Sequence, residues 1–274
     1  MICYKDKHTT IFHSSLYQTT STVVETDHFM LVVDPCWLPG EVEEIRHYVY
    51  SRKGERPLYL LFTHSDYDHI IGYNAFPDAI TIGSKGMERN LEKDSILEQI
   101  RDFDDSYYIK RNYEIAYPQI SYLVSEDGQN LQIGEYCFTF YVANGHTNDG
   151  LFTVIEPLGL WIAGDYLSDI EFPYIYSSSI DYEKTLETAE AILNRHSIKL
   201  LIPGHGSVTT EIDEITKRIN ESRKYIHNTR QLLLEKKEVE AFQILKHYDF
   251  PKVMEKFLRG NLELMKKELK LENE

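Results

Sequence analysis

The chain has 274 residues, of which 42% are hydrophobic and 27% are charged, and its formal net charge is -15. This balance is typical of a soluble globular protein with one large or two small domains. The negative charge repels phosphate backbones and argues against a nucleic-acid partner, although many proteins are simply acidic. No apolar run is long enough to cross a membrane, and the N-terminus lacks the apolar core of a signal peptide. We therefore expect no membrane partner and a cytoplasmic location.

The cysteines exclude two kinds of site. There are three of them, Cys3, Cys36 and Cys137, and no pair has the CxxC spacing. An odd and sparse set does not indicate a disulfide framework, and a zinc site built from thiolates is not expected either.

The first elements that the sequence predicts are strands. Residues 19–25 alternate β-branched and polar side chains, and residues 29–33 form an apolar run that ends at Asp34, which together predict a hairpin feeding a buried strand. Residues 41–50 carry apolar side chains at helical spacing. The short apolar run 58–63 predicts a buried strand that ends directly before His64.

The rest of the chain mixes strands and helices before becoming helical. Residues 122–125 and 131–142 flank a turn-forming segment and are predicted to form a hairpin. Further predicted elements are strands at 80–83, 151–155, 160–163 and 199–202, a helical, tyrosine-rich insertion at 87–118 and a helix at 181–196. Residues 211–274 are almost entirely helical, with a break near Phe250-Pro251.

This order predicts two packed sheets with helices outside. We expect residues 1–210 to form the catalytic domain, including the insertion, and residues 211–274 to form a C-terminal helical extension that packs on it. The sequence shows no repeat and no low-complexity linker.

Four separate segments carry side chains that bind metal ions. The first has the pattern His-x-Asp-x-Asp-His, and the other three are glycine-containing loops with a single histidine or aspartate, each just past a strand-like run: His64, Asp66, Asp68 and His69; His146; Asp165; His205. Imidazole and carboxylate groups are good ligands for zinc, iron or manganese. The first pattern alone is expected by chance about once in a hundred such sequences, but three further loops in order make coincidence remote.

The same residues resemble the metallo-β-lactamase-fold superfamily, whose signature is His-x-His-x-Asp-His followed by single His, Asp and His loops. The resemblance runs from about residue 19 to residue 206. Gly72 matches the family's glycine three residues after the motif, and Asp34 matches an aspartate that supports the site from behind the ligands. The resemblance implies an α+β four-layer αββα sandwich, with the metals at one edge between the sheets and a helical C-terminal extension added.

The resemblance also implies a ligand set and a reaction. A first metal would take His64, Asp66 and His146, a second would take Asp68, His69 and His205, and Asp165 would bridge them together with a hydroxide. Such a dinuclear site hydrolyses a small ester, thioester, lactone or phosphoester. Asp68 would be the catalytic proton shuttle. Tyr67 and Tyr166, each next to a ligand, could donate a hydrogen bond to the developing oxyanion or could serve packing alone.

The sequence departs from the family pattern at Asp66, where the family normally has histidine. Asp66 is either a spectator, so that one metal binds well, or a true ligand; its carboxylate reaches about as far as the histidine nitrogen that it replaces. Zinc is the expected metal, but a site richer in oxygen also suits iron or manganese. The alternative function is therefore a non-haem di-iron protein acting on oxygen, nitric oxide or a sulfur species. A module that keeps the fold without catalysis is the third hypothesis.

Substrate choice is expected to depend on the additions to the core. The insertion and the C-terminal helices could cover the site, and the latter could instead mediate a homodimer. An acidic, tyrosine-lined site favours a small neutral or cationic substrate. Lactonases of the superfamily have a tyrosine three residues after the bridging aspartate, where this chain has Ser168, so lactonase specificity is not expected.

Overall fold

The computed structural model describes residues 1–271, in which the chain divides into two compact units. The first unit consists of residues 1–142 and 149–158, and the second consists of residues 143–148 and the chain from residue 159 onward. None of the helices in this described part of the chain has the length and apolar composition that a membrane-spanning helix needs.

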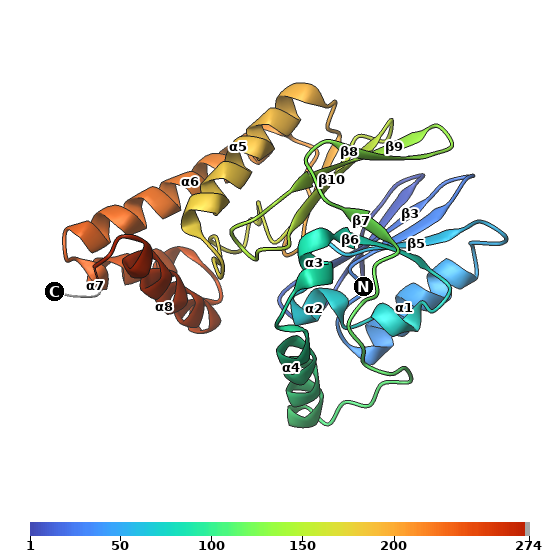
Figure 1. Cartoon of the computed structure of the whole chain (residues 1–274), viewed down its shortest axis with the longest axis horizontal. Coiled ribbons are helices and arrows are strands. Elements are labelled where there is room, and N and C mark those ends of the chain that lie inside the picture. Colours follow the sequence, from blue (N-terminus) through green and yellow to red (C-terminus); the bar gives the residue numbers. More distant parts are fainter. Residues whose placement is uncertain (272–274) are drawn as a thin grey trace. The chain divides into compact units, whose positions relative to one another are not determined.

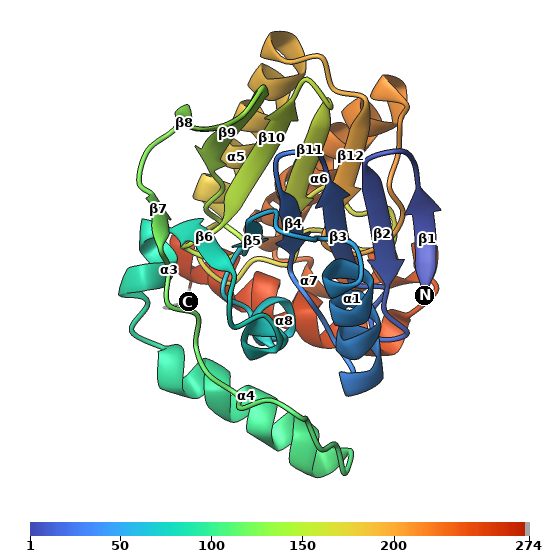
Figure 2. The same ribbon diagram turned by 90° about the vertical axis from the view of Figure 1, so that its right-hand side faces the viewer.

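The first unit is built on a seven-stranded mixed sheet (Figures 1 and 2). The strands follow one another across the sheet in chain order: β1 Ile2–Lys5, β2 Thr9–His13, β3 Thr20–Glu25, β4 Met30–Val33, β5 Leu58–Leu61, β6 Ile80–Ser84 and β7 Tyr122–Val124. Pairing is antiparallel up to β4 and parallel from β4 to β7. All four residues of β4 are buried, as expected where a parallel sheet is covered on both faces.

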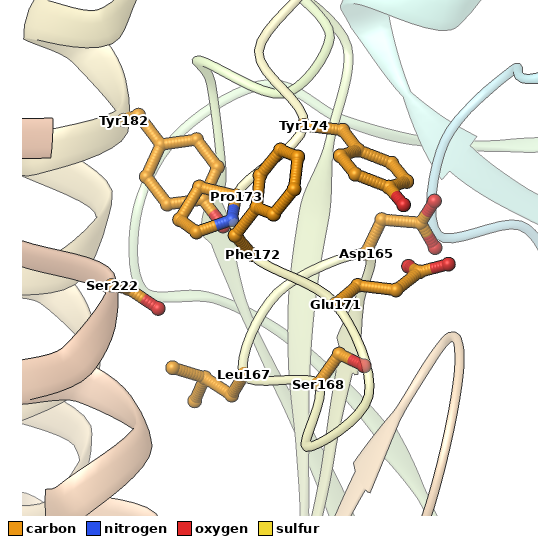
Figure 3. Close-up of a pocket in the computed structure, with 9 residues that line it drawn as sticks. All are labelled: Asp165, Leu167, Ser168, Glu171, Phe172, Pro173, Tyr174, Tyr182 and Ser222. Carbon is orange, nitrogen blue, oxygen red and sulfur yellow. The ribbon is translucent and has the colours of Figure 1, made fainter. Parts of the chain in front are cut away.

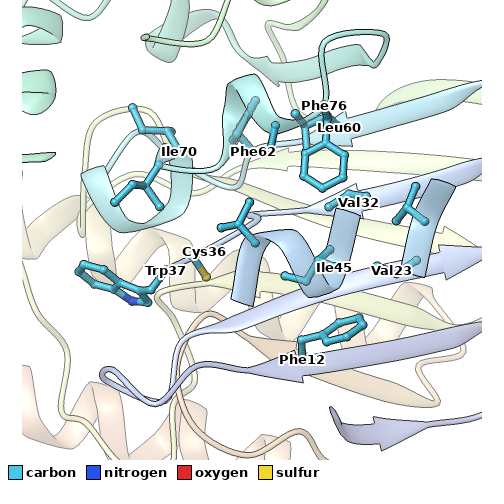
Figure 4. Close-up of a cluster of buried hydrophobic side chains, with 14 of the residues drawn as sticks. Phe12, Val23, Val32, Cys36, Trp37, Ile45, Leu60, Phe62, Ile70 and Phe76 are labelled. Atoms are coloured by element: carbon cyan, nitrogen blue, oxygen red, sulfur yellow. The ribbon is translucent and has the colours of Figure 1, made fainter. Parts of the chain in front are cut away.

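Helices cover one face of this sheet, and Figure 4 shows part of the core between them. Met30 and Val32 of β4 belong to this core, because alternate residues of a strand point to the same face. Helix α1, Pro39–Tyr50, adds buried apolar side chains that are three and four residues apart, including Val42 and Ile45. The other helical elements of the first unit are α2 Tyr67–Ile70, η1 Tyr73–Ala75, α3 Lys85–Arg89 and α4 Lys93–Ser106.

A second, five-stranded sheet has the order β12-β11-β10-β9-β8. Its strands are β8 Gln129–Ile133, β9 Tyr136–Val142, β10 Leu151–Glu156, β11 Leu160–Gly164 and β12 Leu200–Pro203. Within the first unit, the ring centroid of Phe29 lies 5.4 Å from the ring centroids of both Tyr136 and Phe138. These contacts join β9 to the start of β4, so the two sheets pack face to face there.

The second unit is mainly helical (Figure 1). It contains the parallel pair of β11 and β12. Helix α5, Ser179–Arg195, connects these two strands, and the helical elements after β12 are α6 Ile212–Leu234, α7 Glu238–Ala241, η2 Phe242–His247 and α8 Pro251–Glu268. Pro251 occupies the first turn of α8, where a missing backbone N–H costs nothing. The predicted break near Phe250-Pro251 is thus the start of a new helix.

The structure corrects three expectations about the strands. The predicted hairpin of residues 122–125 with 131–142 is wrong, because β7 pairs with β6 in the first sheet while β8 pairs with β9 in the second. Residues 131–142 are two strands, since the apolar alternation changes phase at Gly134, which turns with a φ of 60°. The N-terminal strands β1 and β2 were not predicted from the sequence. Within the predicted insertion, helix ends at Ser106, and the tyrosine-rich residues 107–118 contain neither helix nor strand.

Candidate metal centre

The first unit places four of the predicted ligands on one turn of chain after β5. His64, Asp68 and His69 are buried, and the centroids of the imidazole rings of His64 and His69 lie 4.1 Å apart. The His64 Nε2 atom is 3.7 Å from an oxygen of Asp66, and the His69 Nε2 atom is 3.5 Å from an oxygen of Asp68. Each Nε2 atom therefore faces a carboxylate of its own motif.

Asp34 holds the loop and one of the rings in this part of the candidate site through hydrogen bonds. It is buried at the end of β4, and its oxygens accept hydrogen bonds from the backbone N–H of Thr63 at 2.9 Å and from the Thr63 hydroxyl at 2.6 Å. Its Oδ2 atom also lies 3.0 Å from Nδ1 of His69. One carboxylate thus holds both the loop and a ring, which is how proteins orient metal-binding histidines.

These contacts determine which ring nitrogens carry protons. Because the Thr63 hydroxyl donates its proton to Asp34, its oxygen accepts from Nδ1 of His64, 2.9 Å away. His69 likewise donates from Nδ1 to Asp34. In the neutral form of both rings the proton is therefore on Nδ1 and Nε2 presents a lone pair, which is the form that binds a metal ion.

Replacing Asp34 by asparagine is expected to weaken metal binding about 10- to 100-fold, which is the usual effect of losing a partner of a metal-binding histidine. Asparagine keeps one acceptor oxygen and puts an NH₂ donor in place of the other, so it cannot accept all three hydrogen bonds that Thr63 and His69 donate to Asp34. Titration of the metal-free protein with Zn²⁺ or Mn²⁺ measures the effect, with the exposed turn residue Asp27 changed to asparagine as the control. An unchanged affinity for the metal ion would show that Asp34 does not support the metal-binding residues.

The second unit carries the other three predicted ligands. One oxygen of Asp165, just after β11, lies 3.3 Å from Nε2 of His146 and 3.2 Å from Nε2 of His205, which follows β12. The Nδ1 atom of His146 donates to the backbone oxygen of Tyr174 at 2.7 Å. A carbonyl oxygen can only accept, so the neutral ring of His146 carries its proton on Nδ1 and presents a lone pair at Nε2.

Glycines make room for these loops. At Gly204, a Cβ atom would lie 2.2 Å from Oδ1 of Asp165, so any larger residue would displace that carboxylate. Gly145 has a φ of 123°, a conformation that side chains with a Cβ rarely adopt. The glycines that flank His146, Asp165 and His205 in the sequence are therefore part of how the loops are built.

The two tyrosines that the sequence singled out lie in different surroundings. Tyr166 is buried, and its hydroxyl accepts from the backbone N–H of His146 at 3.0 Å and donates to the carbonyl of Asn144 at 2.8 Å. It therefore supports the His146 loop. Tyr67 packs edge-on against Trp37, with ring centroids 5.2 Å apart, and burial together with the charge of Asp68 raises its pKa above the usual range.

Sequence reasoning missed two groups of polar residues next to the ligands. In the first unit, the Ser65 hydroxyl donates to the buried carboxylate of Asp149, and Asn90 donates to the Ser65 oxygen at 2.9 Å. Asp149 stands outside any motif, and only its place two residues before β10 could have suggested a role. The other missed group surrounds Tyr174 in the second unit.

Tyr174 lines a small cavity of about 10 Å³ that also includes Asp165 and Glu171 (Figure 3). Burial, and after it the charge of Glu171, raises the pKa of Tyr174 well above its usual range, so the phenol stays protonated. No sequence pattern marks this residue, which lies nine positions beyond Asp165.

Groups of histidine and aspartate side chains that could hold a metal ion draw on all seven predicted ligands: His64, Asp66, Asp68, His69, His146, Asp165 and His205. The donors fit divalent metal ions, because neutral imidazole nitrogens and carboxylates are the ligands that zinc, iron and manganese accept.

The family model of the metallo-beta-lactamase superfamily matches residues 15–205, a span that contains every predicted ligand. The chain belongs to the metallo-beta-lactamase superfamily. Members of this superfamily are mostly hydrolases that depend on divalent metal ions. No curated protein matches the sequence.

Solved structures of low sequence identity share the fold of this superfamily member. A metallo-beta-lactamase family protein from Thermus thermophilus has a TM-score of 0.67 at 13% identity, covering 97% of this chain and 94% of that one. A beta-lactamase domain protein from Burkholderia ambifaria has a TM-score of 0.66 at 16% identity, covering 98% and 88%. The sec-alkyl sulfatase PisA1, as a double mutant, has a TM-score of 0.68 at 11% identity; the match covers 97% of this chain and 49% of the sulfatase. These likenesses confirm the predicted αββα sandwich.

Proposed function

We propose that this chain is a dinuclear metal-dependent hydrolase of a small ester, thioester, lactone or phosphoester. Following the superfamily pattern residue by residue, His64, Asp66 and His146 would hold one ion and Asp68, His69 and His205 the other, with Asp165 shared. The observation that supports this most directly is the way in which His64, His69 and His146 are oriented. Each is held through Nδ1 and so offers Nε2 to a metal ion.

Two bound divalent ions would supply an activated water and would polarise the oxygen of the substrate. The chain's own contribution is to place the ligands and to move a proton. Asp68 is buried beside the ligand His69 and holds one carboxylate oxygen 3.5 Å from its Nε2. We assign it to accept the proton of the attacking water and to return it to the leaving group. One water is consumed and one bond breaks: an ester gives an acid and an alcohol, a thioester gives an acid and a thiol, a lactone gives a hydroxy acid, and a phosphoester gives an alcohol and a phosphate.

The experiment that tests this proposal combines metal analysis with turnover. Protein purified without added metal should contain close to two transition-metal ions per chain, and it should turn over at least one member of a panel of p-nitrophenyl esters, thioesters, lactones and bis(p-nitrophenyl) phosphate. Less than one equivalent of metal, together with no turnover after reloading with Zn²⁺, Mn²⁺ or Fe²⁺, would refute the proposal. The Asp68→Ala variant distinguishes catalysis from a contaminating activity.

Asp66 supports a second candidate, a non-haem di-iron protein that acts on oxygen, nitric oxide or a sulfur species. An additional carboxylate in place of histidine lowers the charge of the ligand set by one unit and favours harder ions. The two candidates differ in metal content. Iron as the main bound metal, with consumption of oxygen or nitric oxide, would favour the second, whereas colourless protein that contains only zinc would reject it.

Changing Asp66 to histidine restores the family's usual residue and is expected to shift metal preference from Mn²⁺ or Fe²⁺ toward Zn²⁺ by about tenfold, since imidazole suits zinc better than it suits manganese. Competitive loading of the metal-free wild type and variant with equal amounts of the ions measures this shift. Changing the exposed Asp213 to histidine serves as the control. Identical preferences would mean that Asp66 is a spectator.

We also propose a class of substrate, a native metal, a location and an oligomeric state for this protein. The net charge of -15 supports a small-molecule substrate over a nucleic acid. Zinc as the native metal and a cytoplasmic location are proposed from the superfamily resemblance and from the composition. Dimer formation through the C-terminal helices is a further proposal, which sedimentation of the purified protein would test.

A further inference from the structure

The hydroxyl of Tyr174 is buried without a hydrogen-bond partner among the described residues. The residue is only 8% exposed, and its Oη atom makes no hydrogen bond in this part of the chain. Burying a hydroxyl in this way costs free energy that a phenylalanine would not incur. Buried polar groups in folded proteins normally have hydrogen-bond partners, so a buried hydroxyl without one indicates a functional role for that hydroxyl.

The hydroxyl is also held in place. The side chain of Asn261 on α8 donates to the carbonyl of Pro173 at 2.7 Å and accepts from the backbone N–H of Ile175 at 2.9 Å, so it clamps the segment on both sides of Tyr174. The Tyr174 ring stacks on Phe257 with centroids 4.1 Å apart. A group fixed by its backbone and by its ring cannot turn away to find another partner, and such fixation is what a catalytic donor needs.

The position of the hydroxyl connects it to the proposed metal centre. Tyr174 and Asp165 line the same cavity, and Figure 3 shows the hydroxyl and the Asp165 carboxylate directed to the same side of it. The cavity volume of about 10 Å³ is that of one water-sized group. The backbone oxygen of Tyr174 meanwhile holds His146. One short segment thus orients a ligand and presents a hydrogen-bond donor beside another ligand.

We propose that the Tyr174 hydroxyl donates a hydrogen bond to the substrate oxygen on which negative charge develops during hydrolysis, and this assignment rests on the proposed function. An ester-like or phosphoester oxygen would supply the acceptor that the folded chain lacks. Tyr166 does not suit this role, because backbone groups of residues 143–146 engage its hydroxyl. The inference gives the C-terminal helix α8 a role in catalysis, since Asn261 positions the donor.

The test uses the full-length, metal-loaded Tyr174→Phe variant, which keeps the ring and removes only the hydroxyl. We expect kcat to fall about 100-fold with little change in KM, the usual effect of removing one donor to a developing oxyanion. We also expect the urea midpoint to stay the same or to rise, because no hydrogen bond of the folded chain is lost. The matched control is Tyr248→Phe, which removes a hydroxyl from the same aromatic cluster and should change the rate less than about twofold.

A binding measurement separates this inference from the proposed function. Calorimetric titration of metal-loaded protein with inorganic phosphate should show about tenfold weaker binding by Tyr174→Phe than by wild type. If the wild type turns over no substrate, the proposed function fails, and weaker phosphate binding by the variant would still support the donor role. Equal rates or equal phosphate affinities, a lowered urea midpoint, or a wild type that neither reacts nor binds phosphate would each overturn the inference.

Discussion

Changing Asp165 to asparagine is expected to lower kcat/KM by about 10³-fold or more, with loss of bound metal. One oxygen of Asp165 lies between the Nε2 atoms of His146 and His205, at 3.3 and 3.2 Å. Asparagine carries no charge, and it can present only one oxygen to metal ions that the carboxylate would share. The loss of bound metal and of kcat/KM should therefore exceed the loss caused by changing a residue that only holds a ligand in place, such as Asp34→Asn.

Elemental analysis and steady-state kinetics on the same preparation measure both effects. The control is Asp213→Asn, because Asp213 is an exposed acid in the first turn of α6. That control should keep its full metal content and rate. An Asp165→Asn variant that retained two metal ions and a rate within tenfold of wild type would show that Asp165 is not a shared ligand.

Changing Gly145 to alanine is expected to lower the free energy of unfolding by about 3–5 kcal/mol, the sum of backbone strain and overpacking. The φ of 123° lies in a region that is open to glycine. A Cβ atom there would lie 2.3 Å from the backbone nitrogen of Tyr182, at the start of α5, where no flexible side chain can yield. The carbonyl of Gly145 also accepts from the backbone N–H groups of Ser177 and Ser178, so the shift would spread to both segments.

The matched control is Gly128→Ala. Gly128 also has a positive φ, 77°, but a Cβ atom there would meet nothing within 4 Å. We expect a cost of about 1–2 kcal/mol from the backbone conformation alone. Urea denaturation of both variants measures the difference. Equal losses of stability would show that the contact with Tyr182 relaxes at little cost, and that His146 tolerates movement of its loop.

The sequence could predict the parts of the fold that depend on local pattern. Apolar runs with a period of two or of 3.6 residues mark buried strands and helices, and they located β4, β5 and α1. Strand pairing is not local, which is why the hairpin of residues 122–142 was predicted wrongly. Nothing between β7 and β8 shows that they belong to different sheets, because that choice depends on β6 and β9.

The sequence by itself determined the superfamily and the chemical kind of site. Histidines and aspartates directly after strand-like runs identify candidate ligands, because strand ends are where such folds place functional loops. Asp66 is visible in the same motif, and with it the question of which metal binds.

Only the tertiary structure decided how these groups are oriented. The proton positions on His64, His69 and His146 depend on Thr63, Asp34 and the carbonyl of Tyr174, and the last two are 35 and 28 residues distant in sequence from the rings that they hold. The unpartnered hydroxyl of Tyr174 is likewise a property of its surroundings, since whether a buried group has a hydrogen-bond partner depends on three-dimensional packing and not on its neighbours in the chain.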